Sequence, residues 1–333
     1  MRRLFQRVRR RVFSAPPRPL ILMYHRIGTP AVDPWGLAVS PKHFVEQLTV
    51  LCRTRTVLSM TELVSRLERR TLPANAAAVT FDDGYADNLS EASPRLLEAG
   101  VPATLFVATG FLDRTCPYWW DELATLILAE TVPITCDVDD GRQTWGVSVG
   151  AGDDREVSRS WRAWQEPTTE RQRVYNEMYG RLRGCSAAVR ERVVASLRRA
   201  AGVSASACDG RPMTTAELIA WSARSGLDVG AHTNTHPVLP VLDPAECEVE
   251  IEESKRVCEQ LVNRSVAGFA YPHGAHNEHV RRIVAQNGFA WACTTEARAL
   301  ESGCSDLHAL PRHAVADCDG PAFERWMGTV CID

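Results

Sequence analysis

The sequence predicts an α/β fold built on a mostly parallel sheet, because short apolar runs alternate with segments that carry helix-start signals. A second observation supports this fold, since polar residues directly follow several of the runs, as expected at strand ends. Six runs are strand candidates: Leu20–Tyr24, Ala77–Phe81, Ala103–Val107, Leu227–Ala231, Ala267–Tyr271 and Phe289–Cys293.

Three helix starts between these runs are predicted from capping residues. Ser40 followed by Pro41 combines an N-cap with a proline at the first helical position, and predicts a helix to about Leu51. Thr214 and Glu217 have the spacing of a capping box, and Asp243 caps a segment that continues Pro244-Ala245-Glu246. Each helix is thus expected between two strands, as in a parallel sheet.

Composition excludes two classes of protein. A net charge of −3 provides no excess of cations to neutralise phosphates, so a general nucleic-acid binder is not expected. No stretch approaches 18 uninterrupted apolar residues, so a membrane-spanning helix is not expected either. Eleven cysteines without a C-x-x-C pair predict buried thiols in a reducing compartment.

Residues 1–17 form a basic N-terminal tail. It lacks the apolar core of a secretory signal, which predicts a cytoplasmic protein. Its pattern leaves two interpretations open: an amphipathic segment in peripheral contact with the inner face of the membrane, or a solvated tail. Six arginines carry the charge: Arg2, Arg3, Arg7, Arg9, Arg10 and Arg11.

Residues 18–333 are predicted to form a single domain in which residues 111–213 interrupt the alternation of strands and helices. This segment starts with Tyr118-Trp119-Trp120, continues through a polar section and ends with an Arg-rich helical stretch from Glu170 to Ala201. We expect a largely helical insertion that covers the mouth of the fold, or a small helical subdomain. Trp119 and Trp120 would stack on a bound ligand or pack in a core.

Asp82 and Asp83 are the most informative residues, because two adjacent carboxylates after a buried strand are costly without a nearby cation or proton. His232 and His236 follow another strand and lie four residues apart, a spacing that allows both imidazoles to bind one ion. Pro237 disfavours a helix at this point, so a loop is expected. Two histidines and one aspartate form the ligand set of a catalytic zinc site with one position open for water.

These motifs resemble the polysaccharide deacetylase family, also called the NodB-homology family or carbohydrate esterase family 4. Thr80–Gly84 matches T-F-D-D-G and His232–His236 matches H-x-x-x-H. Phe269–Gly274 is similar to the F-A-Y-P-Y-G branch, in which a Y-H pair (Tyr24–His25) and an L-P-R segment (Leu310–Arg312) also occur. The resemblance spans about residues 20–110 and 216–315.

The resemblance implies a distorted, incomplete (β/α)7 barrel that hydrolyses N-acetyl groups on a sugar. It implies that Asp83, His232 and His236 hold a divalent metal and that Asp82 is the general base. In this chemistry the metal activates water, Asp82 takes a proton, and a backbone N–H near His273 helps to hold the oxyanion. Tyr271 and Tyr85 are further candidates for substrate or oxyanion contacts.

The sequence departs from the family pattern at two groups, the arginine that orients the base and the histidine that acts as general acid. Ala270 stands where the family has an arginine that orients the base, and Arg312 is our candidate to supply that cation. The usual late histidine that acts as general acid is not evident, so His25 and His313 compete for this role. His25 is favoured, because His313 would point to the opposite face of a strand from Arg312.

The predicted function is therefore a metal-dependent hydrolase that deacetylates a glycan or a lipid-linked saccharide. Zn²⁺ is the expected cofactor, and Co²⁺, Ni²⁺ and Mn²⁺ also suit the ligand set. Two alternatives stay open: a deformylase or other C–N hydrolase of the same fold, and a non-catalytic carbohydrate-binding relative. The sugar, its chain length and the oligomeric state are not determined by the sequence.

Overall fold

The computed structural model describes residues 18–152, 154–203, 210–301 and 306–330. The basic tail of residues 1–17, on which the expected membrane contact and cytoplasmic location depend, lies outside the described residues. Within the described part of the chain, no helix is both long and apolar enough to span a bilayer.

The centre of the molecule is a parallel sheet whose strands follow the order β11-β10-β9-β6-β5-β1-β12. Five of the six strand candidates coincide with an observed strand to within one residue at each end, and Phe289–Cys293 starts later than expected. Two short strands of this sheet were not predicted: β12, and β4 (Thr56–Val57), which pairs with β5. The separate short pair β2 (Arg26–Ile27) and β3 (Ala38–Val39) was not predicted either. The seven strands along the path are β1 (Leu20–Tyr24), β5 (Ala76–Phe81), β6 (Ala103–Val107), β9 (Leu227–Ala231), β10 (Gly268–Ala270), β11 (Trp291–Cys293) and β12 (His313–Ala314).

The sheet curls into an incomplete barrel because one short segment contacts both of its edges. Leu310 forms a parallel bridge with Cys293 at the end of β11, and three residues later His313 pairs with Leu22 of β1. The chain thus spans the gap between the two edge strands without closing it. This arrangement confirms the predicted incomplete (β/α)7 barrel.

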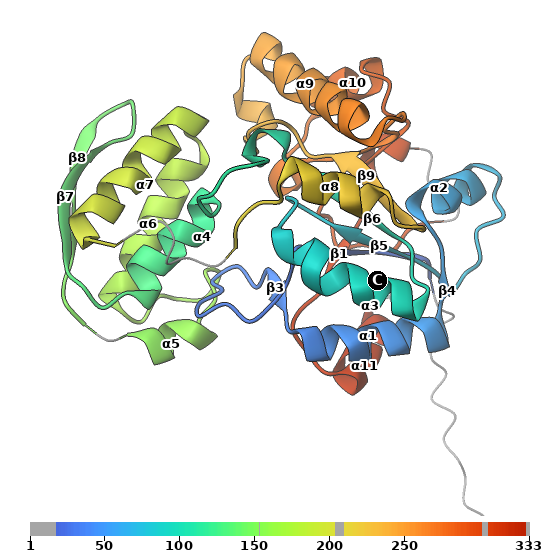
Figure 1. The fold of residues 1–333 in the computed structure, drawn as a ribbon, viewed down its shortest axis with the longest axis horizontal. Helices are drawn as coiled ribbons and strands as arrows, with labels where there is room; N and C mark the ends of the chain where they lie inside the picture. Colours follow the sequence, from blue (N-terminus) through green and yellow to red (C-terminus); the bar gives the residue numbers. More distant parts are fainter. Residues whose placement is uncertain (1–17, 153, 204–209, 302–305, 331–333) are drawn as a thin grey trace, which may run out of the picture.

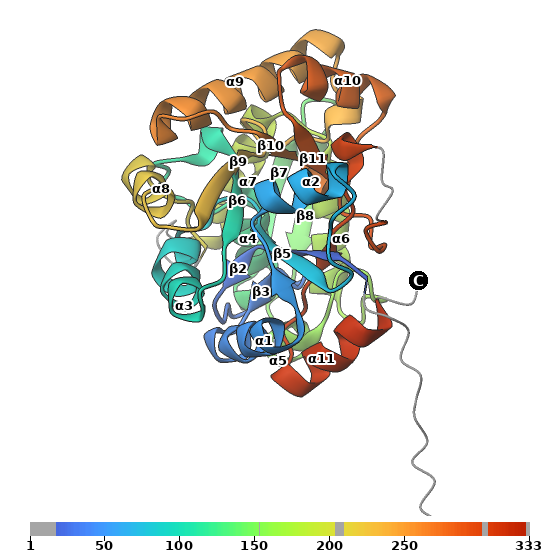
Figure 2. The ribbon, with the colours of Figure 1, turned by 90° about the vertical axis from the view of Figure 1, so that its right-hand side faces the viewer.

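Helices cover the outside of the curled sheet (Figures 1 and 2). The three predicted caps are confirmed: the side chains of Ser40, Thr214 and Asp243 accept the expected backbone N–H groups. The first of these helices continues to Thr54, three residues beyond the expected end. The outer helices are α1 (Pro41–Thr54), α2 (Met60–Glu68), α3 (Ser93–Ala99), α8 (Thr215–Ser222), α9 (Pro244–Val262), α10 (Glu278–Gln286) and α11 (Gly320–Thr329).

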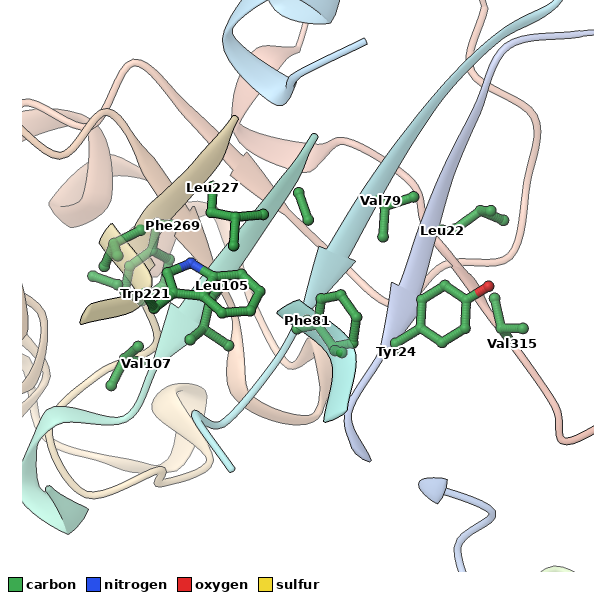
Figure 3. Close-up of a cluster of buried hydrophobic side chains, with 14 of the residues drawn as sticks. Leu22, Tyr24, Val79, Phe81, Leu105, Val107, Trp221, Leu227, Phe269 and Val315 are labelled. Carbon is green, nitrogen blue, oxygen red and sulfur yellow. The ribbon is translucent and has the colours of Figure 1, made fainter. Parts of the chain in front are cut away.

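Both faces of the sheet are buried, which explains why its strands are continuous apolar runs. Alternate residues such as Leu22, Tyr24, Val79 and Phe81 pack against the outer helices (Figure 3). Ile21, which precedes Leu22 on β1 and points to the opposite face, belongs to a separate cluster inside the barrel. A side chain that follows this inner face beyond the end of a strand therefore points into the mouth of the barrel.

The described residues of the segment 111–213 form a second lobe beside the barrel, at the left of Figure 1. It has its own apolar core, in which Trp119 and Trp120 are buried together with side chains of α6 and α7. The lobe also contains an antiparallel hairpin in its polar section, where no strand was predicted, so the insertion is less helical than expected. Its elements are α4 (Trp119–Ala124), β7 (Ile134–Asp139), β8 (Thr144–Val149), α5 (Arg155–Ser160), α6 (Glu170–Arg183) and α7 (Ala187–Ala201).

Candidate active site

A cavity of about 340 Å³ lies where the strands of the barrel end, and the inserted lobe forms part of its wall. Parallel strands bring their carboxyl ends to one edge, which is where α/β proteins place their functional groups. Six predicted site residues line this cavity: His25, Asp82, Asp83, His232, His236 and His273.

Asp82 extends the inner face of β5 by one step of the strand period. Thr80 lies two residues earlier on that face, and both side chains contact the same guanidinium, that of Arg312. Arg312 Nη1 and Nη2 donate to Asp82 Oδ1 and Oδ2 at 2.6 and 2.7 Å, and both residues are almost fully buried. The structure thus places a bidentate cation on Asp82, where Ala270 cannot provide one.

This ion pair controls the charge of Asp82. Burial raises the pKa of the carboxyl, but the charge and hydrogen bonds of Arg312, together with the nearby His232 and His25, hold the pKa below its ordinary value. Asp82 is therefore ionised at neutral pH. A carboxylate has about four lone-pair directions, so the two bonds from Arg312 leave capacity to accept a proton.

Asp83, His232 and His236 form a buried cluster whose ligand atoms lie within 4.8 Å of one another. Asp83 Oδ1 is 3.5 Å from His232 Nε2 and 3.4 Å from His236 Nε2. A tetrahedral zinc ion with bonds of about 2.1 Å separates its ligand atoms by about 3.4 Å. Asp83 Oδ1 also has no hydrogen-bond partner among the described residues, so the cluster fits a divalent cation.

The orientation of His232 is fixed by a hydrogen bond from its other ring nitrogen. Nδ1 lies 2.8 Å from the carbonyl oxygen of Ala270, so Nδ1 carries the proton and the lone pair of Nε2 faces Asp83. A hydrogen bond of this kind is the usual support of a metal-binding histidine.

Electrostatics at the two histidines also favour a cation between them. Burial lowers the pKa of His236 well below its ordinary value, so the ring is neutral, as a metal ligand must be. Burial also lowers the pKa of His232, but the neighbouring carboxylates of Asp83 and Asp82 raise it by more. Two carboxylates thus draw positive charge to this position.

The backbone around the cavity is unusual. Asp83, Thr233, His236 and His273 have positive φ values of 71°, 65°, 55° and 58°. Such values are uncommon for residues other than glycine, and most unfavourable for a β-branched residue such as threonine. Conformations of this kind persist only where the surrounding structure holds them, and they concentrate at functional sites.

The two candidate general acids are placed differently. His25 follows β1 and lines the cavity. His313 lies on β12, where it pairs with Leu22 of β1, and its ring packs near Trp326 of α11. It is not among the residues that line the cavity. Arg312 faces Asp82 from the preceding position, in keeping with the expected alternation of side chains.

Two other predicted residues have their side chains outside the cavity. The hydroxyl of Tyr271 donates to the carbonyl oxygen of His308, and its ring stacks on His276. The hydroxyl of Tyr85 donates to Asp121 Oδ2 at 2.7 Å within the core of the inserted lobe. Neither side chain is in a position to contact a substrate in the cavity.

The cavity wall also includes residues that the sequence did not single out. Trp35 and Tyr179 bring two rings together with centroids 4.5 Å apart, and the exposed Arg183 lies beside them. Trp120, left between sugar stacking and core packing, is buried and lies 4.8 Å from the His236 ring. No local motif marks these residues, because the packing of the inserted lobe brings them to the site.

Comparison with known families gives a match to the polysaccharide deacetylase model over residues 69–135 and 197–292. The stretch left out, 136–196, lies within the inserted lobe. A curated Bacillus subtilis (strain 168) protein, "Putative polysaccharide deacetylase YxkH", is 27% identical over 98 residues. The match covers 29% of this chain and 35% of that protein, so only about a third of the relative's length is matched.

Solved structures are similar over nearly the whole chain. The Streptococcus pyogenes deacetylase PplD in complex with acetate has a TM-score of 0.58 at 19% identity, covering 94% of this chain and 99% of that chain. IcaB from Ammonifex degensii has a TM-score of 0.56 at 17% identity, covering 94% and 97%. These similarities concern the fold. The family-model match and the motifs that line the cavity are those of the polysaccharide deacetylase family, and these structures share its fold.

Proposed function

We propose that this protein is a metal-dependent hydrolase that removes N-acetyl groups from a glycan or a lipid-linked saccharide. The observation that carries the proposal is the pairing of a three-ligand cluster with an ionised carboxylate in one cavity. A protein that only binds sugars has no need for a base beside a metal. PplD, which shares the fold, was solved with acetate, the acid that N-deacetylation releases.

Asp83, His232 and His236 would hold the metal, and Zn²⁺ is the first choice for two imidazoles and one carboxylate. When bound, the metal would polarise the acetyl carbonyl and make a water molecule more acidic.

The remaining steps fall to residues of the chain. Asp82, kept ionised by Arg312, takes a proton as the water oxygen adds to the acetyl carbon. The N–H groups of Gly274 and Ala275 serve the hydrogen bonds of their own turn, and that of His273 is our donor for the oxyanion. His25 gives a proton to the departing amine when the C–N bond breaks, so acetate and a free amino sugar leave.

The aromatic wall supports a carbohydrate substrate. Trp35, Tyr179 and Trp120 line the cavity together with the charged groups, and amphipathic rings suit the apolar faces of a sugar. We propose an N-acetylated saccharide as the partner of this site.

The proposal is tested by measuring acetate release from N-acetylglucosamine oligomers with protein loaded with Zn²⁺ or Co²⁺. We expect release that a chelator abolishes and added metal restores. Formate release from an N-formyl sugar, with no acetate from the matching acetyl sugar, would favour the deformylase instead. Retained metal with no release from either class would contradict the proposed activity.

A further inference from the structure

The loop that carries His236 is held from two sides, and one side belongs to the inserted lobe. On the barrel side, Glu250 of α9 accepts the N–H groups of Asn234 and Thr235 at 2.9 and 2.7 Å. After β6, the N–H groups of Thr109 and Gly110 donate to the carbonyl oxygens of Thr233 and Asn234.

The carbonyl groups at the end of this loop are bound by Arg190 of α7. Its Nη1 donates to the carbonyl oxygens of Thr235 and His236 at 3.3 and 3.2 Å. Its Nε and Nη2 donate to the carbonyl oxygens of Leu182 and Arg183 at the end of α6. One guanidinium therefore joins the His236 loop to two helices of the inserted lobe.

Arg190 is unusual for a buried cation. It is only 2% exposed and its guanidinium lies over the Trp119 ring, and within the described residues it has no carboxylate within ion-pair distance. Burying an arginine without a carboxylate is costly, and here backbone carbonyls supply the compensation. The loop needs such a restraint, because Thr233 and His236 both have positive φ values.

Two more contacts link the lobe to the same ligand set. The Trp120 ring packs on the His236 ring, and the Tyr118 hydroxyl donates to the carbonyl oxygen of Asp83 at 2.9 Å. Both residues lie at the start of α4. The lobe thus contacts two of the three ligands.

We propose that the inserted lobe completes the metal site, with Arg190 as a positioning residue that holds His236 in its ligand orientation. This inference rests on the proposed metal-dependent function. It assigns the lobe a role in metal affinity in addition to its role as a wall of the cavity.

The test titrates the metal-free full chain with Zn²⁺ or Co²⁺ alone, and compares the wild type with Arg190→Met. We expect the affinity for the metal to fall about 10- to 100-fold, the usual effect of losing a group that orients a ligand. The visible spectrum of the Co²⁺ form should also change, because His236 would no longer be held in place.

Arg171→Met is the matched control. Arg171 is equally buried, and it donates to the carbonyl oxygens of Ile127, Val132 and Gly150, all within the lobe. We expect both variants to lower the thermal midpoint, and only Arg190→Met to weaken metal binding. Equal metal affinity in the wild type and Arg190→Met, or an equal loss in both variants, would overturn the inference.

If Arg190→Met does not fold, Arg190→Lys decides, since a lysine keeps the charge but cannot form the same fork of hydrogen bonds. We expect a several-fold loss of metal affinity, and unchanged affinity would overturn the inference. A wild type that binds no metal would instead contradict the proposed function itself.

Discussion

The barrel edge around Asp82 and the loop around His236 hold their functional side chains by different means. Asp82 is bound directly by a side chain of the barrel, the Arg312 guanidinium. His236 is held by two residues of the inserted lobe: the Arg190 side chain binds its backbone carbonyl, and the Trp120 ring packs on its imidazole. Substitutions on the barrel side should therefore impair proton transfer to Asp82, and substitutions on the lobe side should weaken metal binding.

The largest expected effect is that of Asp82→Asn. The amide keeps the shape of the side chain but cannot take a proton, so kcat should fall about 10²- to 10⁴-fold or more. Metal content should stay near one ion per chain, as atomic absorption would measure. Asp87→Asn is the control, because Asp87 pairs with Arg26 and does not line the cavity. Loss of the metal in Asp82→Asn would mean that the roles of Asp82 and Asp83 are reversed.

Arg312→Met should lower kcat nearly as much as Asp82→Asn does, and it should also destabilise the fold. It leaves Asp82 buried without its cation, and breaking a buried pair of this kind costs about 3–5 kcal/mol of unfolding free energy. The double variant Asp82→Asn/Arg312→Met should recover part of that loss, since no unpaired charge remains. Urea unfolding of the three variants measures this, and a double variant whose loss equals the sum of the two single losses would contradict the coupling.

A smaller effect is expected for Tyr118→Phe on the lobe side. It removes one buried hydrogen bond to the carbonyl oxygen of Asp83 and should cost about 0.5–1.5 kcal/mol of stability together with some affinity for the metal. Tyr24→Phe is matched to it, because Tyr24 donates to Gln47 on the outer side of the sheet. Chemical unfolding and metal titration of both variants should show similar stability losses, and a weaker metal site in Tyr118→Phe alone. A metal affinity that falls equally in both would show that the lobe contact has no special role.

The smallest expected effect concerns Glu217, where the chain returns from the lobe to the barrel. Hydrogen bonds from Arg211 lower the pKa of Glu217 to about 2, against about 4.3 in an unfolded chain. Its contribution to stability is therefore present above about pH 4.3 and is lost as the pH falls through about 2. The pair is partly exposed to solvent, so Glu217→Gln should cost about 1 kcal/mol or less at pH 7. The difference from the wild type should shrink between pH 5 and pH 2, and a constant difference would mean that the charge of Glu217 is not its source.

The barrel side could largely be predicted from the sequence because its information is local. Each strand is an apolar run of suitable length, and Asp82 and Asp83 lie directly after one of them. Even the position of Arg312 beside Asp82 could be predicted, because the arginine missing at Ala270 required a replacement and side chains alternate along a strand.

The lobe side could not be predicted in the same way, because its contacts join residues far apart in the sequence. Arg190 and His236 are 46 residues apart, and an arginine in an Arg-rich helix resembles a solvated one. The β7–β8 hairpin was also missed. Ile134 and Val138 are buried while Thr135 and Asp137 are exposed, an alternation that is detectable but weak in a polar section.

The most direct test of the metal site is a crystal structure of the Zn²⁺-loaded protein, with the ion located by its anomalous scattering. We expect one ion bound by Asp83, His232 Nε2 and His236 Nε2, with Asp82 still paired to Arg312 beside it. An ion bound through Asp82 or at another place in the chain, or no ion at saturating Zn²⁺, would contradict this assignment.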